Sequence, residues 1–166
     1  MVGARAAGGL SVDFPSGWQR YEALPPGRYG GEGVQESFQN PRELGETLTV
    51  FAAYADAARG GADRPRAVGD VYESAEALGA ALAEAAPQQE LVRAREVRAP
   101  GGARAFEVLF SASAITAGPY GKTYEWRKYL VDGAGRLVWV RATATSKRYY
   151  AVRGALQHCV DSFGAR

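Results

Sequence analysis

The residue types that could support nucleophilic or acid–base chemistry gather near the C-terminus. His158 and Cys159 are the only histidine and the only cysteine of the 166-residue chain, and Asp161 and Ser162 follow them. A Ser–His–Asp triad needs each side chain to reach the next, whereas a single helix fixes the outward direction of each of these residues. The surrounding sequence supplies neither an oxyanion hole nor a turn that exposes the serine. We therefore expect no catalytic residue and no enzyme activity, with a solvated His158 and a small buried thiol at Cys159.

Two glycine-rich segments have the residue types of phosphate-binding loops. Residues 116–123 end in Gly121-Lys122-Thr123, but Thr116 stands where the first glycine is required, and strand-like residues follow. A phosphate loop needs a helix N-terminus there, because the backbone amides of that helix converge on the anion. Residues 30–33 likewise lack the strand-to-helix setting of a dinucleotide site. Both segments are predicted to be loops or turns, and no cofactor is expected.

The acidic residues weighed as calcium ligands are Glu32, Glu36 and Glu43. Calcium takes about six to eight oxygen ligands around one point, and three scattered glutamates do not meet that requirement. The single cysteine and single histidine exclude disulfide scaffolds and zinc modules built from several such residues. We expect these glutamates to be solvated and no metal to be bound.

The C-terminal third interleaves cations with aromatic residues, a mixture that can bind a partner. Successive residues of a strand point to opposite faces, so most of the aromatics are expected in the core and the long cations at its edge. The net charge of +2 is too slight to imply a polyanionic partner, and an acidic protein surface suits the exposed cations as well as RNA does. The predicted partner-binding residues are Arg127, Lys128, Arg136, Arg141, Lys147 and Arg148.

The elements that must position these residues are mostly strands. Alternation of apolar and polar residues, with β-branched and aromatic residues between turn signals, predicts strands at 10–14, 33–38, 46–54, 91–97, 103–113, 122–131 and 136–143. The last four are expected to form two antiparallel hairpins. Residues 56–69 contain glycines, a proline and charges without an apolar period, and they are predicted to form a mobile surface loop.

Two helices are predicted from capping residues and from apolar residues spaced three or four apart. The first begins after Ser74, has Glu76 in its first turn and ends near Pro87. The second spans residues 146–163, with Ser146 as its cap. This element order predicts an α+β protein, a single-domain α/β/α sandwich with a central, largely antiparallel sheet. Residues 9–166 form the expected domain, and residues 1–8 are interpreted as an N-terminal remnant.

Short motifs distributed along the chain resemble those of one family. They are Pro15-Ser16-Gly17-Trp18, Leu48-Thr49-Val50, Ser74-Ala75-Glu76-Ala77-Leu78, Gly135-Arg136-Leu137 and Asp161-Ser162-Phe163. In this order and spacing they resemble the PsbP family, which comprises the extrinsic oxygen-evolving subunit of photosystem II and its PsbP-like and PsbP-domain relatives. The likeness covers about residues 9–164 and implies an antiparallel sheet between helical layers.

The resemblance also implies a location in the thylakoid lumen of a chloroplast or cyanobacterium and a non-enzymatic role. True PsbP carries a lysine-containing N-terminal extension, whereas only nine residues precede the first predicted strand here. The family histidine linked to metal binding would fall near Tyr124, and this strand has no histidine. Both departures favour an auxiliary or assembly factor that binds lumenal subunits of photosystem II or photosystem I.

Two alternatives remain open. One is a true extrinsic subunit of the oxygen-evolving complex that supports calcium and chloride retention. The other is a soluble protein-binding module of the same fold outside the plastid, as in the related Ran-binding nuclear import factor.

Overall fold

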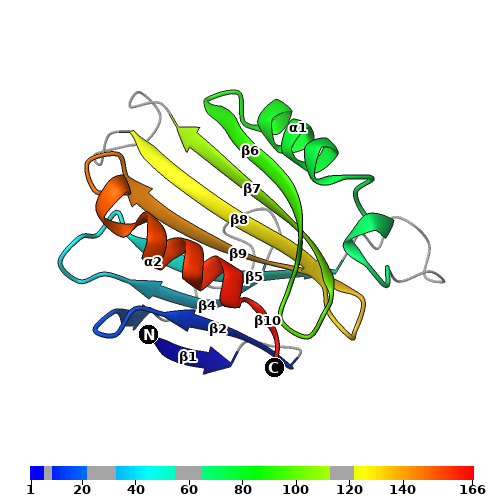
Figure 1. Ribbon diagram of the computed structural model, residues 1–166, viewed down its shortest axis with the longest axis horizontal. Coiled ribbons are helices and arrows are strands. Elements are labelled where there is room, and N and C mark those ends of the chain that lie inside the picture. Colours follow the sequence, from blue (N-terminus) through cyan, green and yellow to red (C-terminus); the bar gives the residue numbers. More distant parts are fainter. Residues whose placement is uncertain (6–8, 22–32, 55–64, 113–121) are drawn as a thin grey trace.

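The structure is a computed structural model that describes residues 1–5, 9–21, 33–54, 65–112 and 122–166. In this part of the chain the strands form two antiparallel sheets (Figure 1). The smaller sheet has the order β1 (Val2–Arg5), β2 (Leu10–Phe14) and β10 (Gly164–Ala165). The larger, seven-stranded sheet has the order β3 (Gln19–Tyr21), β4 (Gly33–Gln39), β5 (Thr47–Tyr54), β9 (Arg136–Thr145), β8 (Thr123–Val131), β7 (Arg104–Ala112) and β6 (Gln89–Arg98).

The described residues also form a 3₁₀ turn, η2 (Val68–Asp70), and two α-helices, α1 (Ala75–Ala85) and α2 (Tyr149–Ser162). Helix α1 begins as predicted, because the Ser74 hydroxyl accepts a hydrogen bond from the Ala77 amide at 3.0 Å. The predicted cap of α2 is wrong. Arg148 is its N-cap and makes no side-chain capping bond, while Ser146 lies in the preceding turn and donates its amide to the Lys122 carbonyl.

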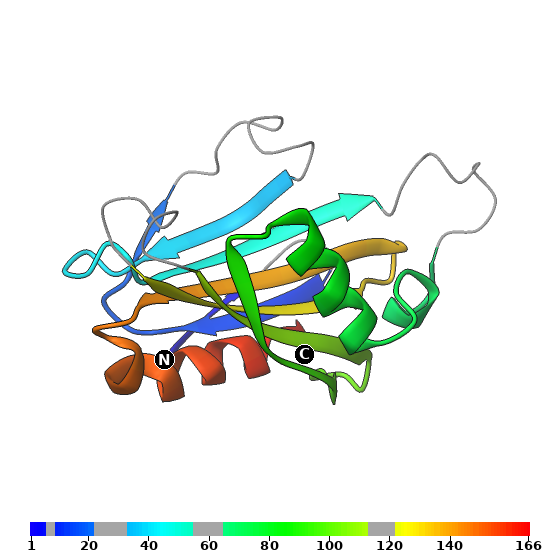
Figure 2. The same ribbon diagram turned by 90° about the horizontal axis from the view of Figure 1, so that it is seen from above.

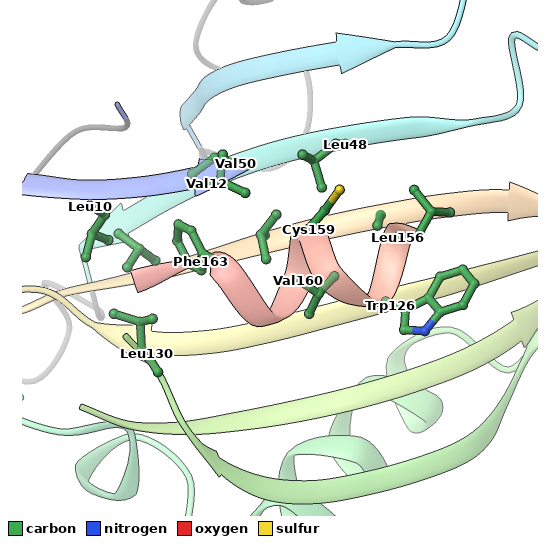
Figure 3. Packing of buried hydrophobic residues seen from close by; sticks show 14 of the residues in the cluster. Leu10, Val12, Leu48, Val50, Trp126, Leu130, Leu156, Cys159, Val160 and Phe163 are labelled. Atoms are coloured by element: carbon green, nitrogen blue, oxygen red, sulfur yellow. The ribbon is translucent and has the colours of Figure 1, made fainter. Parts of the chain in front are cut away.

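The helices pack on opposite faces of the larger sheet (Figure 2), which confirms the predicted α+β sandwich. On the face of α2, alternate residues of β8 such as Trp126 and Leu130 join Leu156, Cys159 and Val160 of the helix in one apolar core (Figure 3). The smaller sheet adds Leu10 and Val12 to this core. On the face of α1, a second core contains Leu78, Phe106, Phe110, Tyr129 and Trp139. Period-two alternation along the strands therefore builds both cores.

The two ends of the domain meet in the smaller sheet. Residues 2–5, which fall within the expected N-terminal remnant, form β1 and pair with β2 from Val2 opposite Phe14 to Arg5 opposite Ser11. Strand β10 pairs with the other edge of β2, and the Ala165 amide donates to the Pro100 carbonyl. The smaller sheet thus ties the first and last described residues to the α2 face of the domain.

The sequence predicted the long strands to within a few residues. The short strands β1, β3 and β10 and the turn η2 were not predicted. Most of the predicted surface loop at 56–69 lies outside the described residues. None of the helices in the described part of the chain is long and apolar enough to cross a membrane.

Candidate functional site: a basic and aromatic ridge at the start of α2

The six cations predicted to bind a partner do not share one surface, and Lys128 lies deepest. Its side chain points to the α2 face of β8, where it is 1% exposed. The ammonium donates to the carbonyls of Val160 at 3.1 Å and Asp161 at 2.9 Å, at the C-terminal end of α2. A cation at this end complements the helix dipole. Burial nevertheless lowers the pKa of Lys128 to about 8, against the opposing charges of Asp161 and Glu107.

Arg127 and Arg141 lie opposite each other on β8 and β9, on the other face of the sheet. Both contact the carboxylate of Glu125, Arg127 at 2.9 Å and Arg141 at 3.4 Å. Each guanidinium also stacks on an aromatic ring, Arg127 on Phe110 and Arg141 on Phe51. These contacts hold both cations flat against the sheet and neutralise part of their charge.

Arg136 closes the hairpin between β8 and β9. Its guanidinium donates to the buried carboxylate of Asp132, four residues earlier, at 2.7 Å. The other Asp132 oxygen accepts from the amides of Ala134 and Arg136. Arg136 therefore stabilises a turn.

Lys147 and Arg148 lie where β9 passes into α2, next to two residues that were not among the predicted partner-binding residues. Lys147 is exposed, and Arg148 is partly exposed while its Nε donates to Glu46 at 2.8 Å. Tyr150 and Arg153 follow on the outward side of α2, and Tyr150 is 79% exposed. We call Lys147, Arg148, Tyr150 and Arg153 the α2 ridge.

The Tyr150 ring is held in place although it is exposed. It meets the ring of Tyr149 edge-on, with 5.2 Å between the two ring centroids. The Arg153 guanidinium lies over the Tyr150 ring, 5.3 Å from the centroid of that ring. Tyr149 in turn stacks on Tyr124 and Trp126 of β8. An exposed aromatic ring that is already ordered loses little entropy when a partner covers it. The spacing of Tyr149, Val152 and Leu156 could have identified Tyr150 and Arg153 as outward-facing residues.

The ridge carries positive charge at the positive end of a helix. The first turn of α2 contains no acidic residue, and Arg148 supplies no side-chain cap. A cation there is disfavoured by the helix dipole by about 0.3–1 kcal/mol, so the arrangement does not stabilise α2. Glu46, buried at 2% exposure, compensates Arg148, and Glu43 lies 4.0 Å from the same guanidinium. Lys147 and Arg153 leave the ridge with a net positive potential around an exposed aromatic ring.

The candidate chemistry near the C-terminus is divided among separate contacts. His158 is exposed, as expected. Its Nε2 lies 3.2 Å from the Oδ2 atom of Asp13. The Ser162 hydroxyl donates to the Cys159 carbonyl and accepts from the Asp13 amide, so it is engaged away from His158. Burial raises the pKa of the Cys159 thiol to about 12, which makes it unreactive at neutral pH.

The other sequence candidates also lie apart. Thr123 begins β8, so Gly121-Lys122-Thr123 leads into a strand, and Gly33 begins β4. Residues 30–32, which include Glu32, and residues 116–121 lie outside the described residues. Glu36 pairs with Arg20, whereas Glu43 lies near Arg148. Within the described residues, no group of three or more His, Cys, Asp or Glu side chains is placed to hold a metal ion.

Comparisons with known proteins relate this chain to others through its fold. No family model matches the sequence, and no curated protein matches it. Among solved structures, the cyanobacterial PsbP protein CyanoP from Synechocystis sp. PCC 6803 superposes with a TM-score of 0.71 at 15% identity, over 99% of this chain and 92% of that chain. A Pseudomonas aeruginosa protein, PA94, described as of unknown function and a putative regulator, superposes with a TM-score of 0.51 at 14% identity, over 100% of this chain and 97% of that chain. The chain therefore has the PsbP-like α+β fold.

Proposed function

We propose that this chain is a non-enzymatic PsbP-domain protein of the thylakoid lumen. In this proposal it binds a photosynthetic membrane complex as an auxiliary or assembly factor. The observation that carries the proposal is the fold shared with CyanoP over nearly the full length of both chains. The short motifs that resemble those of the PsbP family support the same assignment.

The proposed docking surface is the α2 ridge, and its proposed partner is an acidic surface of a lumenal photosystem subunit. Lys147 and Arg153 attract such a surface, and Tyr150 provides the large, ordered ring that commonly anchors an interface. Arg148 belongs to the ridge but already pairs with Glu46, so its contribution is smaller. The partly neutralised Arg127 and Arg141 are a secondary part of the proposal.

The experiment separates solubilised thylakoid complexes by size and locates this protein among the fractions. We expect it to migrate with photosystem II, photosystem I or one of their assembly intermediates, and to be released by a high-salt wash that screens exposed charges. Continuous presence in mature photosystem II would favour an extrinsic oxygen-evolving subunit, and presence only in intermediates an assembly factor. Absence from the thylakoid fraction would contradict the proposal.

A second candidate is a protein-binding module of the same fold that acts outside photosynthesis. The likeness to PA94 favours it, because that protein is described as of unknown function and a putative regulator, with no mention of a photosynthetic complex. The same α2 ridge would then bind an acidic soluble protein. A soluble location, with a partner captured through Tyr150, would support this candidate over the first.

A further inference from the structure

A pocket lies on the α2 face of the molecule, between the smaller sheet and the open edge of the larger one. Its volume is about 450 Å³, and Gly3 and Ala4 of β1 line it on one side. Residues of β3 and β4, at the edge of the seven-stranded sheet, line the other side. A volume of this size falls in the range of small-molecule sites.

The apolar wall of the pocket consists of aromatic rings from three segments. Phe14 at the end of β2 stacks on Phe38 of β4 with 4.0 Å between ring centroids. Trp18, in the connection from β2 to β3, completes this wall and is partly exposed. Stacked rings with an open side accept the flat or flexible apolar part of a ligand.

The polar residues of the pocket carry a net charge of +1. Arg20 and Glu36 form an ion pair, and Arg5 is an exposed cation at the end of β1. Since the charges of Arg20 and Glu36 offset each other, Arg5 supplies the excess. An apolar wall beside one excess cation is complementary to a molecule with an apolar body and a single anionic group.

We propose that this pocket binds a monoanionic amphiphile, whose apolar body lies against Phe14, Trp18 and Phe38 and whose carboxylate or sulfonate faces Arg5. Both a fatty acid and an arylalkanoic acid have this chemistry. The site is separate from the α2 ridge, so the inference does not depend on the proposed function.

The probe is anilinonaphthalene sulfonate, which has an apolar aromatic body and one sulfonate. Of the three tryptophans, Trp18 lines the pocket and is therefore the energy-transfer donor nearest to bound probe. We expect one saturable site, and weaker energy transfer in Trp18→Phe. Displacement by dodecanoate identifies an aliphatic ligand and displacement by phenylpropanoate an aromatic one, each kept below micelle-forming concentrations.

Charge variants test the role assigned to Arg5 and Glu36. Arg5→Gln should weaken probe binding by about threefold, and Glu36→Gln should strengthen it by a similar factor. Arg98→Gln, an exposed arginine on β6, is the matched control and should bind the probe as the original protein does. Backbone NMR shifts on binding should centre on residues 3–5 and 36–38.

Three results would overturn the inference. They are unchanged affinity in Arg5→Gln, NMR shifts centred on the exposed apolar residues Leu44 or Tyr150, and equal binding of dodecyltrimethylammonium and dodecanoate. Because Arg5 is exposed, its substitution leaves the core intact and keeps the test independent of folding.

Discussion

Lys128 and Glu107 form a pair of buried charges beneath the end of α2. Glu107 is fully buried and accepts hydrogen bonds from Arg93, Arg95 and Gln157, while Lys128 donates to the last carbonyls of the helix. Each charge is satisfied by named partners, as buried ions must be. The pair lies opposite in neighbouring strands and links β7, β8 and α2. This is a structural role for a cation that the sequence placed among partner-binding residues.

At the residue scale, the pKa of Lys128 predicts how stability depends on pH. Burial lowers this pKa to about 8 from an ordinary value of 10.5, so between these values the unfolded chain binds the proton that the folded chain has lost. The free energy of unfolding must therefore rise with pH relative to a variant without this group. The free energy of unfolding of the original protein minus that of Lys128→Met should therefore increase by about 1–2 kcal/mol between about pH 7 and pH 9.5.

Urea denaturation at each pH measures this difference. Burial raises the pKa of Tyr129 to about 12, so its ionisation in the folded protein lies above the window. Titration of tyrosine and cysteine in the unfolded state is common to both proteins and cancels. A difference that stays constant would show that Lys128 keeps its ordinary pKa in the folded protein, and one that falls as pH rises would show that folding raises this pKa.

At the element scale, what could be predicted depended on whether a segment has a local signal. Strands β5, β7, β8 and β9 combine alternation with β-branched or aromatic residues, and helix α1 has its capping serine, so local sequence identified them. Strands β1 and β10 form by pairing with the two edges of β2, and no local sequence pattern encodes that pairing. The cap of α2 was misassigned because Ser146 instead belongs to the turn that follows β9.

The glycines at the C-terminal end provide an element-scale prediction. A Cβ on Gly164 of β10 would lie 2.6 Å from the Pro100 carbonyl oxygen and 2.9 Å from its nitrogen, and backbone atoms cannot move aside cheaply. Gly164→Ala should therefore lower the free energy of unfolding by about 1–3 kcal/mol. Gly154 of α2 has open space around its Cβ position, so Gly154→Ala should raise it by about 0.5–1 kcal/mol.

Urea denaturation of both variants measures the two effects with opposite signs. Thermal melting followed by circular dichroism checks that each variant retains the fold. If Gly164→Ala were as stable as the original protein, the contact between β10 and the β6–β7 turn would be looser than described.

At the scale of the whole molecule, folding separates the basic and aromatic residues that are mixed in the sequence. Strand alternation sends Lys128 to one face of the sheet and Arg127 and Arg141 to the other, as the sequence analysis expected for such a pattern. The ridge itself was only half predicted, through Lys147 and Arg148. Tyr150 and Arg153 are exposed because Tyr149 packs against β8, so that the opposite side of α2 faces outward.

The charge of the α2 ridge predicts how partner binding responds to mutation. Lys147→Glu combined with Arg153→Glu reverses both exposed cations and should weaken binding to the partner complex by at least about tenfold, mainly through slower association. Surface-immobilised complex and purified variants measure both rates. Arg98→Glu on β6, outside the ridge, makes the same change of charge as each single substitution and should bind as the original protein does. Equal affinities for all three proteins would exclude the ridge as the docking surface.

The proposed function requires that the α2 ridge of this protein lies against a photosynthetic membrane complex. A photo-reactive phenylalanine analogue placed at Tyr150 in cells that produce this chain tests this contact, because Tyr150 is the aromatic residue of the ridge and is 79% exposed. Val92 on β6, which is 53% exposed and lies outside the ridge, provides the matched control position. We expect illumination to join position 150 to a lumenal photosystem subunit, while position 92 gives no such product. Equal products from both positions, or a product at position 150 with a protein outside the photosynthetic complexes alone, would contradict it.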